Sequence, residues 1–540
     1  MKRLWMKKAL SLSLALLMLL SLVACGSNDK ADNDAGKANT SDKADSGKTD
    51  AGKTESADKD TSSEPELKER VVIGMSGIME NRDPHATTVT VNSFAYRLTH
   101  NTLLEWNSET KVFDPELAES WEMNEDGTVV TFKLREDVDF QNGEHFTAAD
   151  VVYSYGRAMQ SAAQLSTLEN VESVEAIDEY TVQFNLKGYD AEFYDNVASN
   201  NYLSILNEKA ITEDPDNGTS VGTGAYIVSD WVPGDQLLLT RNENYWGELP
   251  PSKELLLRAI GEPSARVVAL QTGEIDVCYS VPGIEAASLA DSQGCELIQV
   301  PTNTIVYLAM NVSGTCEPLM DENLRLALIH ATDSEGIILG VKEGFADLPN
   351  GPVPQGLWGY DENVQPYHYD LEKAKEYMAA SNYPDGLELD LMYRGDRYPG
   401  LFEVLQAQWA QIGVTLNLQT DDPAVYSDLM SAGTYEVAGA QIGTSTIGYM
   451  LNLIWTSDAS ANMTRYGSEE MDKLLSDAMA EMDTEKRAEM YAELQQMITD
   501  TKTQIPLYIN MDLHGHRTGV TGIVYNSAGG IDYTYVAATK

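Results

Sequence analysis

Residues 26 to 66 of the 540-residue chain contain no Val, Ile, Leu, Met, Phe, Tyr or Trp and consist mainly of Ala, Asp, Gly, Lys, Ser and Thr. Such a segment cannot bury enough apolar surface to offset the entropy lost on ordering. As a flexible coil of this length it would span roughly 35 Å on average. We therefore predict a disordered tether over residues 25–66, and we expect the folded structure to be confined to the residues that follow.

The leader that precedes this spacer has the pattern of an export signal. Four basic residues among the first eight are followed by sixteen mostly apolar residues, 9 to 24. This run is too short for a comfortable transmembrane helix and is typical of a signal-peptide core. The stretch "LVAC" that ends at Cys25 resembles the bacterial lipobox, in which a diacylglycerol is attached to the cysteine sulfur. We predict a lipoprotein signal peptide over 1–24 and lipidation of Cys25, against the alternative of an incidental cysteine in a soluble secreted protein.

The body of the chain begins at residue 67 and is long enough for two or three hydrophobic cores. The sequence has 37 Lys and Arg against 84 Asp and Glu, a formal net charge of −47, which argues against nucleic acid as a partner and against direct docking on anionic lipid. Beyond Cys25 the cysteines are Cys278, Cys295 and Cys316, an odd number without CxxC spacing. We expect neither a disulfide framework nor a zinc site, although one bond between two of the three stays open.

Strand and helix patterns are intermixed along this body. Apolar or alternating runs predict strands at 71–75 and 129–136, two strands within 171–187, and two more within 224–242. A capping-box pattern formed by Thr147 and Asp150 predicts a helix that starts there.

Helices of the later chain are predicted from their stop signals and periodicity. Gly273 closes a short helix before a buried strand near Ile275, and Gly413 closes a helix before the strand at 414–420. Residues 371–382 are helical in pattern, and Met490, Leu494, Met497 and Ile498 fall on one helical face. Strands alternating with helices indicate an α/β protein.

One long segment and several short ones match a known family in the usual order. The stretch from Asp114 to Ala158, "DPELAESW…DVVYSYGRA", resembles the signature of the extracellular solute-binding proteins of family 5, the peptide and nickel receptors of ABC importers. The shorter matching segments are "RDPH" at 82–85, 221–235, 241–247, 269–277, 307–312, 324–338 and 466–478. The resemblance covers nearly all of the body, from Val71 to about Tyr535.

This resemblance implies an α/β, two-lobe, periplasmic-binding-protein-like fold with a subdomain inserted in the first lobe and a hinge cleft. The crossings between lobes are expected near residues 301–307 and 514–521. The expected ranges are 67–301 for lobe I with its inserted subdomain at about 97–214, 302–514 for lobe II, and 515–540 for the return to lobe I. The ligand is expected between the lobes and enclosed by hinge closure.

The resemblance also implies a function. We expect a lipid-anchored substrate-binding receptor that captures extracellular oligopeptides and delivers them to the permease and ATPase subunits of an ABC importer. It would be a monomer, bind no nucleic acid, need no cofactor, and reside on the outer face of the cytoplasmic membrane, anchored by Cys25. The style of tether suggests a Gram-positive cell.

Ligand contacts are expected from both lobes. By position in the family, Thr88, Val89 and Thr90 after "RDPH" would line the ligand, with Asn303 and Tyr307 near the crossing. In many peptide-binding members an aspartate in a "W-x-x-D" stretch takes the peptide's amino terminus.

The corresponding stretch here is 435–450, "YEVAGAQIGTSTIGYM", which has no Asp and no Trp. Thr444 or Ser445 stands where the carboxylate would be, and Gln441 lies in the same stretch as a further candidate. Hydroxyl groups can hydrogen-bond a carbonyl, an amide or a sugar, but they cannot neutralise an ammonium group. The resemblance therefore leaves selectivity for free di- or tripeptides open.

Other functions remain as alternatives. A non-peptide solute such as an oligosaccharide or a nickel complex is one, and a sensory or adhesion receptor without transport is another. His514 and His516 in "LHGH" share one face of a strand, but no third ligand is evident, so we expect two surface histidines and no metal site. We expect no enzyme, because neither GxSxG nor HExxH frames the Ser, His and acidic residues.

Overall fold

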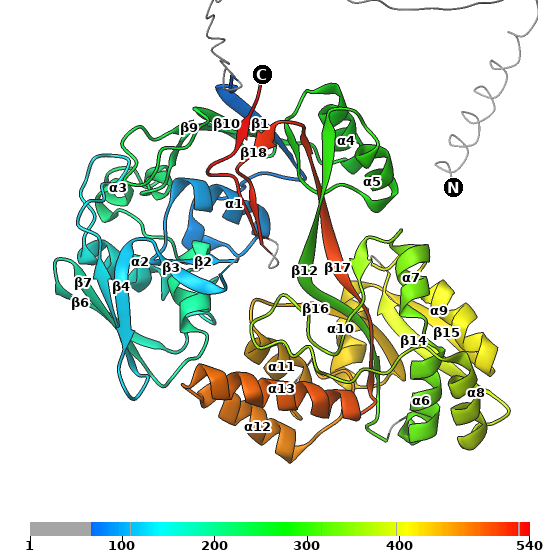
Figure 1. Cartoon of the computed structure of the whole chain (residues 1–540). Coiled ribbons are helices and arrows are strands. Elements are labelled where there is room, and N and C mark those ends of the chain that lie inside the picture. Colours follow the sequence, from blue (N-terminus) through cyan, green and yellow to red (C-terminus); the bar gives the residue numbers. More distant parts are fainter. Residues whose placement is uncertain (1–65, 109, 315, 396, 460, 527–529) are drawn as a thin grey trace, which may run out of the picture. The chain divides into compact units, whose positions relative to one another are not determined.

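Two long paired strands organise the structure. The computed structural model describes residues 66–540 apart from 109, 315, 396, 460 and 527–529, so the predicted signal peptide, Cys25 and nearly all of the tether lie outside the described residues. Strands β12 (Cys295–Met310) and β17 (Gln504–Arg517) pair antiparallel from one end to the other. They lie within an 11-stranded sheet of order β15-β14-β16-β12-β17-β11-β1-β10-β9-β8, in which β13 also pairs with β17. Figure 1 shows the pair passing from one lobe into the other.

The ladder between the two strands is interrupted next to Pro301. The register shifts between Pro301 and Ile305, and proline has no N–H to donate to a ladder. The hydroxyl of Thr302 fills part of the gap, because its Oγ1 donates to the carbonyl of Asn510 at 2.9 Å and accepts the backbone N–H of Thr304 at 3.1 Å. A rotation of one lobe against the other would therefore meet the least resistance here.

Lobe I is built on the parallel pair β1 and β10, which β9 and β8 extend in antiparallel fashion. Its core also contains Val520, Tyr533 and Val536 from the last residues of the chain. The elements of this lobe are β1 (Arg70–Met75), α1 (Thr90–Thr99), β8 (Tyr226–Val232), β9 (Gln236–Arg241), β10 (Glu254–Ala259), α4 (Pro263–Thr272), β11 (Val277–Cys278), α5 (Gly283–Ala290), β18 (Val520–Thr521), β19 (Val524–Tyr525), β20 (Ile531–Asp532) and β21 (Ala537–Ala538).

A separate core lies within residues 103–205, in the predicted inserted subdomain. Its four-stranded antiparallel sheet has the order β4-β5-β7-β6, and its centre is aromatic, with Phe132, Phe184 and Phe193 in mutual contact. The capping box predicted at Thr147 and Asp150 is confirmed. The elements are β2 (Leu104–Asn107), β3 (Val112–Pro115), β4 (Ala118–Met123), β5 (Val129–Leu134), α2 (Ala148–Ala158), β6 (Val171–Asp178), β7 (Thr181–Leu186) and α3 (Glu208–Glu213).

Lobe II places one core on each face of its part of the sheet. Alternate residues of β12 divide between them: Val306 and Leu308 belong to one core, Tyr307 and Ala309 to the other, as the two-residue period of a strand requires. The elements are α6 (Glu322–Ala331), α7 (Ser334–Val341), β13 (Ala346–Asp347), α8 (Leu371–Ala380), β14 (Leu387–Arg394), α9 (Leu401–Trp409), β15 (Val414–Asp421), α10 (Pro423–Ala432), β16 (Val437–Gly443), α11 (Ile447–Trp455), α12 (Glu469–Ala480) and α13 (Thr484–Asp500).

Most of the predicted elements are confirmed. The strands expected at 71–75 and 129–136 are β1 and β5, and the two predicted strand pairs are β6–β7 and β8–β9. Gly273 and Gly413 both end their helices in the left-handed region, with φ of 78° and 82°, where glycine is favoured because it has no Cβ. Cys278, Cys295 and Cys316 are free and buried. Within the described part of the chain, no helix has the length and apolar character needed to cross a bilayer.

A buried arginine fixes the end of lobe I that meets the crossing strands. The side chain of Arg266, on α4, is 1% exposed. Its guanidinium donates to the carbonyls of Ile260 at 2.6 Å, Tyr279 at 2.9 Å and Ser280 at 3.1 Å, and at 3.3 Å to that of Gly261. Ser280 has φ of 60°, a conformation that costs free energy in a residue with a Cβ. The charged donor therefore holds a strained segment in place.

We expect Arg266→Met to lower the free energy of unfolding by about 3 kcal/mol, because four carbonyl groups would lose a charged, buried donor. Chemical denaturation followed by circular dichroism measures this loss. Arg258→Met is the matched control: its ion pair with Glu274 lies at the surface, with the side chains 36% and 57% exposed, so it should cost less than about 1 kcal/mol. Equal losses in the two variants would contradict the structural role given to Arg266.

Candidate functional site

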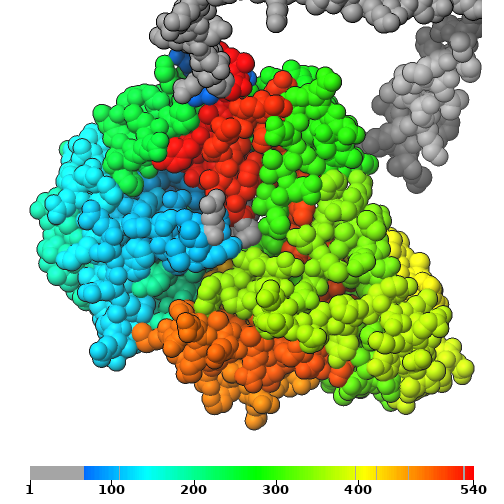
Figure 2. Space-filling model, in the orientation of Figure 1, coloured from blue at the N-terminus to red at the C-terminus, as the bar shows by residue number. Residues whose placement is uncertain are grey.

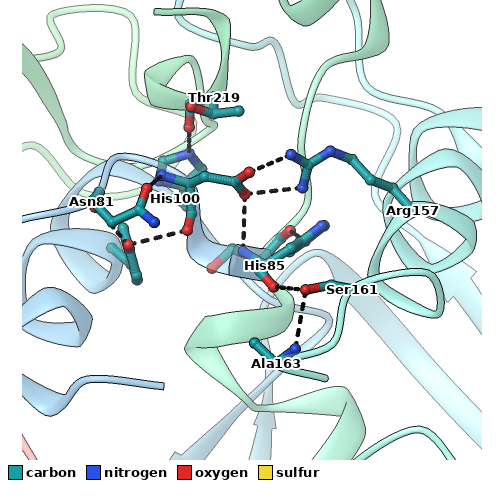
Figure 3. Close-up of polar contacts among 10 residues, drawn as sticks. Asn81, His85, His100, Arg157, Ser161, Ala163 and Thr219 are labelled. Atoms are coloured by element: carbon teal, nitrogen blue, oxygen red, sulfur yellow. Dashed lines mark hydrogen bonds and ion pairs between the residues drawn. The ribbon is translucent and has the colours of Figure 1, made fainter. Parts of the chain in front are cut away.

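The "RDPH" motif, residues 82–85, anchors the segment of lobe I that was predicted to touch ligand. The carboxylate of Asp83 caps the backbone N–H of His85 at 3.0 Å and forms an ion pair with Arg157 of the subdomain. His85 Nε2 bonds the carbonyl of Ser204 at 3.0 Å, and Ser161 donates to the carbonyl of His85 at 2.6 Å. Figure 3 shows His85, Arg157 and Ser161 converging on this turn. The motif therefore builds the support of the site.

Two buried histidines, one in the motif and one at the end of α1, are held in the neutral form. Burial lowers the pKa of His85 to about 4, against the opposing effect of its bond to Ser204. Burial likewise lowers the pKa of His100 to about 4, although Nε2 of His100 bonds the carbonyl of Thr219 at 3.0 Å (Figure 3). Both are therefore neutral, packed groups at physiological pH.

The three predicted ligand residues of lobe I follow the anchored turn. Thr88, Val89 and Thr90 are all exposed, Val89 at 51%. Val89 is the N-cap residue of α1, and its N–H donates to the hydroxyl of Thr87 at 3.1 Å. A short exposed segment held at one end by a half-buried ion pair is positioned to contact a ligand, and the assignment of these three residues stays a prediction.

The predicted residues of lobe II gather at one end of the β12–β16 ladder. Val306 lies opposite Gln441 and Thr304 opposite Gly443, so Gln441 and the loop that follows β16 lie beside the interruption in β12. In this loop Thr444 donates its hydroxyl to the carbonyl of Thr446 at 2.8 Å, whereas Ser445 is exposed.

Asn303 and Tyr307 differ in what they can offer a ligand. Asn303 is 5% exposed, and its Oδ1 has no hydrogen-bond partner among the described residues; a buried acceptor of this kind is costly unless a ligand or water satisfies it. Tyr307 is 4% exposed and packs within a core of lobe II. The geometry therefore gives Asn303 a free polar atom, and gives Tyr307 a packing role beside it.

The subdomain and lobe II also touch through four residues that we name the interlobe latch: Tyr189, Glu192, Tyr449 and Arg487. The backbone N–H of Tyr449, in the first turn of α11, donates to Glu192 Oε1 at 2.9 Å. Arg487 of α13 donates to the hydroxyl of Tyr189 at 2.7 Å. In Figure 1 one end of α13 lies beneath the subdomain, away from the crossing strands. The lobes are thus joined covalently by β12 and β17 and non-covalently by the latch.

Close packing and buried charge characterise the latch. A Cβ on Gly448 would lie 2.6 Å from the hydroxyl oxygen of Tyr491 and 2.9 Å from Glu192 Oε1, so a larger residue here would displace these side chains. The Arg487 guanidinium lies 4.9 Å from the ring centre of Trp358, a cation–π geometry. Burial raises the pKa of Glu192, whereas the hydrogen bond from the N–H of Tyr449 lowers it. Burial, with the nearby charge of Glu192, raises the pKa of Asp195 to about 7, against the attraction of Arg487.

The two histidines of "LHGH" are buried, which corrects the expectation that they lie at the surface. His514 is 4% exposed and His516 9% exposed. The ring of His514 packs 5.3 Å from that of Tyr279 and 5.2 Å from that of Tyr525, and its Nδ1 accepts the N–H of Ser280 at 3.3 Å. Burial lowers the pKa of His514 to about 4. No group of three metal-ligating side chains occurs in the part of the chain that the structure describes.

No pattern in the sequence indicated the latch. Tyr189 and Glu192 lie in "YDAEFYD", 189–195, which mixes aromatic and acidic residues as many surface turns do. Arg487 lies in a helix among other charged residues, 298 positions from Tyr189. The pairing depends on how the subdomain sits against lobe II, which local patterns do not encode.

Comparison with known proteins agrees with this architecture. Residues 112–464 match the model of the bacterial extracellular solute-binding proteins, family 5. The heme-binding protein A of Haemophilus influenzae is 27% identical over 447 residues, which cover 76% of this chain and 81% of that protein. The probable D,D-dipeptide-binding periplasmic protein of Escherichia coli is also 27% identical, over 85% of this chain and 92% of its own length.

Solved structures show the same two-lobe arrangement. An ABC transporter-associated periplasmic binding protein of Helicobacter pylori, in complex with the peptide STSA, is 26% identical over 88% of this chain and 99% of its own, with a TM-score of 0.68. A substrate-binding protein of Listeria monocytogenes has a TM-score of 0.78 at 22% identity, over 88% of this chain and all of its own. The chain therefore belongs to the bacterial extracellular solute-binding proteins of family 5, the non-enzymatic substrate-binding components of ABC importers.

Proposed function

We propose that this receptor captures extracellular oligopeptides between its lobes and delivers them to a permease. The observation that carries the proposal is the chemistry at the end of the β12–β16 ladder. There the free Oδ1 of Asn303, the amide of Gln441 and the hydroxyl of Ser445 offer neutral donors and acceptors. Peptide main chain presents the same kinds of group and is commonly bound through them.

The predicted ligand wall of lobe II carries no formal charge. From Val437 to Met450 the sequence contains no Asp, Glu, Lys, Arg or His. A wall of this kind has nothing with which to neutralise a peptide ammonium group or carboxylate. We infer that this wall binds the main chain or hydroxyl groups of the ligand, and that no charged side chain of the wall pairs with the peptide's amino terminus. The peptide in the Helicobacter pylori complex and the dipeptide named for the Escherichia coli relative support a peptide as the ligand.

The interlobe latch supports enclosure of the ligand. Its hydrogen bonds form only when the subdomain lies against α11 and α13. They therefore stabilise the closed arrangement of the lobes and do not stabilise an open one. Because Glu192 of the latch and the neighbouring Asp195 are both desolvated beside a single arginine, part of this gain is offset. A small net gain suits a receptor that must open again at the permease.

The first prediction concerns the peptide's amino terminus. A peptide in free form and the same peptide N-acetylated should bind with dissociation constants that agree within about threefold, because no carboxylate of the lobe II wall pairs with the amine. Isothermal titration calorimetry measures both. A loss of roughly 100-fold on acetylation, near 2.7 kcal/mol, would show that a carboxylate elsewhere takes the amine.

Two variants sharpen this test. Ser445→Asp places a carboxylate at one of the two positions, Thr444 and Ser445, that correspond to the family's aspartate, and it should create a preference for the free amine, whereas Ser445→Ala should create none. If no peptide binds, the proposal of a peptide ligand is wrong. The uncharged wall would then favour a neutral, hydroxyl-rich solute such as an oligosaccharide.

The second prediction concerns the latch. Glu192→Ala removes the acceptor of the Tyr449 N–H, so ligand affinity should fall about five- to tenfold, the effect of one charge-assisted hydrogen bond. The radius of gyration of the ligand-bound protein, measured by solution X-ray scattering, should also increase. Glu172→Ala changes an exposed glutamate of the same subdomain and should alter neither quantity. If both variants compact on binding as the wild type does, the latch has no part in closure.

The third prediction concerns the anchor. We propose that Cys25 is lipidated and holds the receptor at the outer face of the cytoplasmic membrane, and the leader and lipobox pattern support this. In the native host the wild type should partition with membranes, and Cys25→Ala should be released or remain unprocessed, since the sulfur carries the lipid. Fractionation with immunoblotting, and mass spectrometry of the mature amino terminus, measure this. Equal membrane partitioning of the two forms would rule lipidation out.

A further inference from the structure

The large sheet has a gap at the point where the two lobes meet. On the edge of β17 away from β12, β13 pairs with residues 509–510 and β11 pairs with residues 515–516. No strand of the described chain pairs with this edge at residues 511–513, where the carbonyl of Leu513 accepts the N–H of Val281 at 2.6 Å. An open strand edge of this kind presents backbone N–H and C=O groups that a ligand can use.

A cavity of about 280 Å³ occupies this gap. Its wall combines residues of lobe I between 280 and 284, residues of lobe II between 341 and 345, and residues 511–513 of β17; none of the predicted interlobe ligand residues lines it. In Figure 1 the flanking helices α5 and α7 lie on the side of the crossing strands opposite to the subdomain. Figure 2 shows orange-red atoms of β17 between the green part of lobe I and the yellow-green part of lobe II.

Asp512 brings an unpaired carboxylate to this cavity. It lines the cavity and lies on the same face of β17 as Asn510, because side chains alternate along a strand. Its oxygens make no hydrogen bond within the described part of the chain, and they are not among the fully buried polar atoms that lack a partner, so they keep accessible surface. Burial raises the pKa of Asp512, and the charge of Lys342 lowers it.

Lys342 places an ammonium group over the same face of β17. Its Nζ donates to Oδ1 of Asn510 at 3.4 Å and lies 5.2 Å from the ring centre of Tyr508. Burial lowers the pKa of Lys342, and the charge of Asp512 raises it, but no ion pair joins these two side chains of the described chain. The wall therefore contains a partly buried cation and a partly buried anion, neither of which has a close charged partner.

Two further features of the wall favour a ligand. Ser280 of lobe I and Glu343 of lobe II have φ of 60° and 55°, and strained residues of this kind often lie where a ligand is held. The wall also has an aliphatic part, formed by Val281, Ile284 and Val341. The side chain of Ile284 is 78% exposed, more than any other large hydrophobic residue of the described chain, so a ligand has apolar surface to cover.

We propose that this cavity binds a free aliphatic α-amino acid in its zwitterionic form. The ammonium group of the amino acid pairs with Asp512, its carboxylate pairs with Lys342, and its side chain lies against Val281, Ile284 and Val341. Both charges of the wall then gain a charge-assisted hydrogen bond, and the ligand brings no net charge into a partly buried site. This site is independent of the proposed capture of peptides between the lobes.

The test compares leucine with two relatives that each lack one charge. N-acetylleucine keeps the carboxylate and lacks the ammonium group, whereas leucine methyl ester keeps the ammonium group and lacks the carboxylate. Saturation-transfer NMR and calorimetry measure the binding of each compound to the purified receptor at millimolar concentration. Leucine should bind at least about tenfold more tightly than either relative, the effect of one charge-assisted hydrogen bond. Equal binding of leucine and either relative, or no binding of leucine, would overturn the proposal.

Two variants assign the charges to their partners. Asp512→Asn should remove the preference for leucine over N-acetylleucine and keep the preference over the methyl ester, and Lys342→Met should do the reverse. Poor folding would not separate the two preferences in this way. Any other pattern in variants that melt as the wild type does would overturn the assignment, and retention of both preferences would place leucine elsewhere, as in the interlobe cleft. The comparison of the three compounds on the wild type does not depend on these variants.

Matched controls make the same changes away from the cavity. Asp428→Asn and Lys373→Met alter exposed residues of lobe II, so both should keep the two preferences of the wild type. If either control loses a preference, the effect of charge removal is not specific to the cavity and the proposal is wrong.

Discussion

The pairing of β12 with β17 is the constraint on which the rest of the structure depends. Because these strands carry both lobes, every other strand of the large sheet takes its place outward from them. The ladder shifts register next to Pro301, where the hydroxyl of Thr302 replaces ladder bonds, and again between Val306 and Tyr307. Because the strands are paired on either side of this irregular stretch, the lobes can move as rigid bodies, and hinge closure leaves their packed cores unchanged.

The interlobe latch differs from the β12–β17 pair, because its contacts must form when the lobes close and break when they open. Its one cation, Arg487, is shared among the hydroxyl of Tyr189, the carbonyl of Glu481 and the ring of Trp358, while Glu192 and Asp195 are both driven by burial toward the protonated form. Carboxylates without a dedicated counter-ion make a contact that is specific in geometry and modest in strength. By contrast, the guanidinium of Arg266 donates to four carbonyl groups in a part of lobe I that does not have to move.

Local signals predicted much of the fold, because the interactions behind them span only a few residues. The capping box at Thr147 and the helix ends at Gly273 and Gly413 are of this kind. The burial of His514 was not predictable, since the rings that cover it come from Tyr279 and Tyr525 through a tertiary arrangement. The candidate site divides in the same way: the family pattern indicated which segments of each lobe to examine, whereas the unpaired oxygen of Asn303 is a consequence of packing around the interrupted ladder.

Two glutamines of lobe II show that packing, and not residue type, decides which hydrogen bonds a buried side chain makes. Gln495 and Gln504 are nine positions apart and both buried, at 1% and 9% exposure. Gln495 donates to the carbonyls of Gly359 and Tyr491 and accepts the N–H of Asp361, so its amide is fully used in fixing the chain that covers lobe II. The amide of Gln504 is also buried, but neither of its polar atoms has a hydrogen-bond partner in the described part of the chain. Since a sequence assigns both residues the same donors and acceptors, only the packing around each one distinguishes an amide that is fully hydrogen-bonded from one that is not.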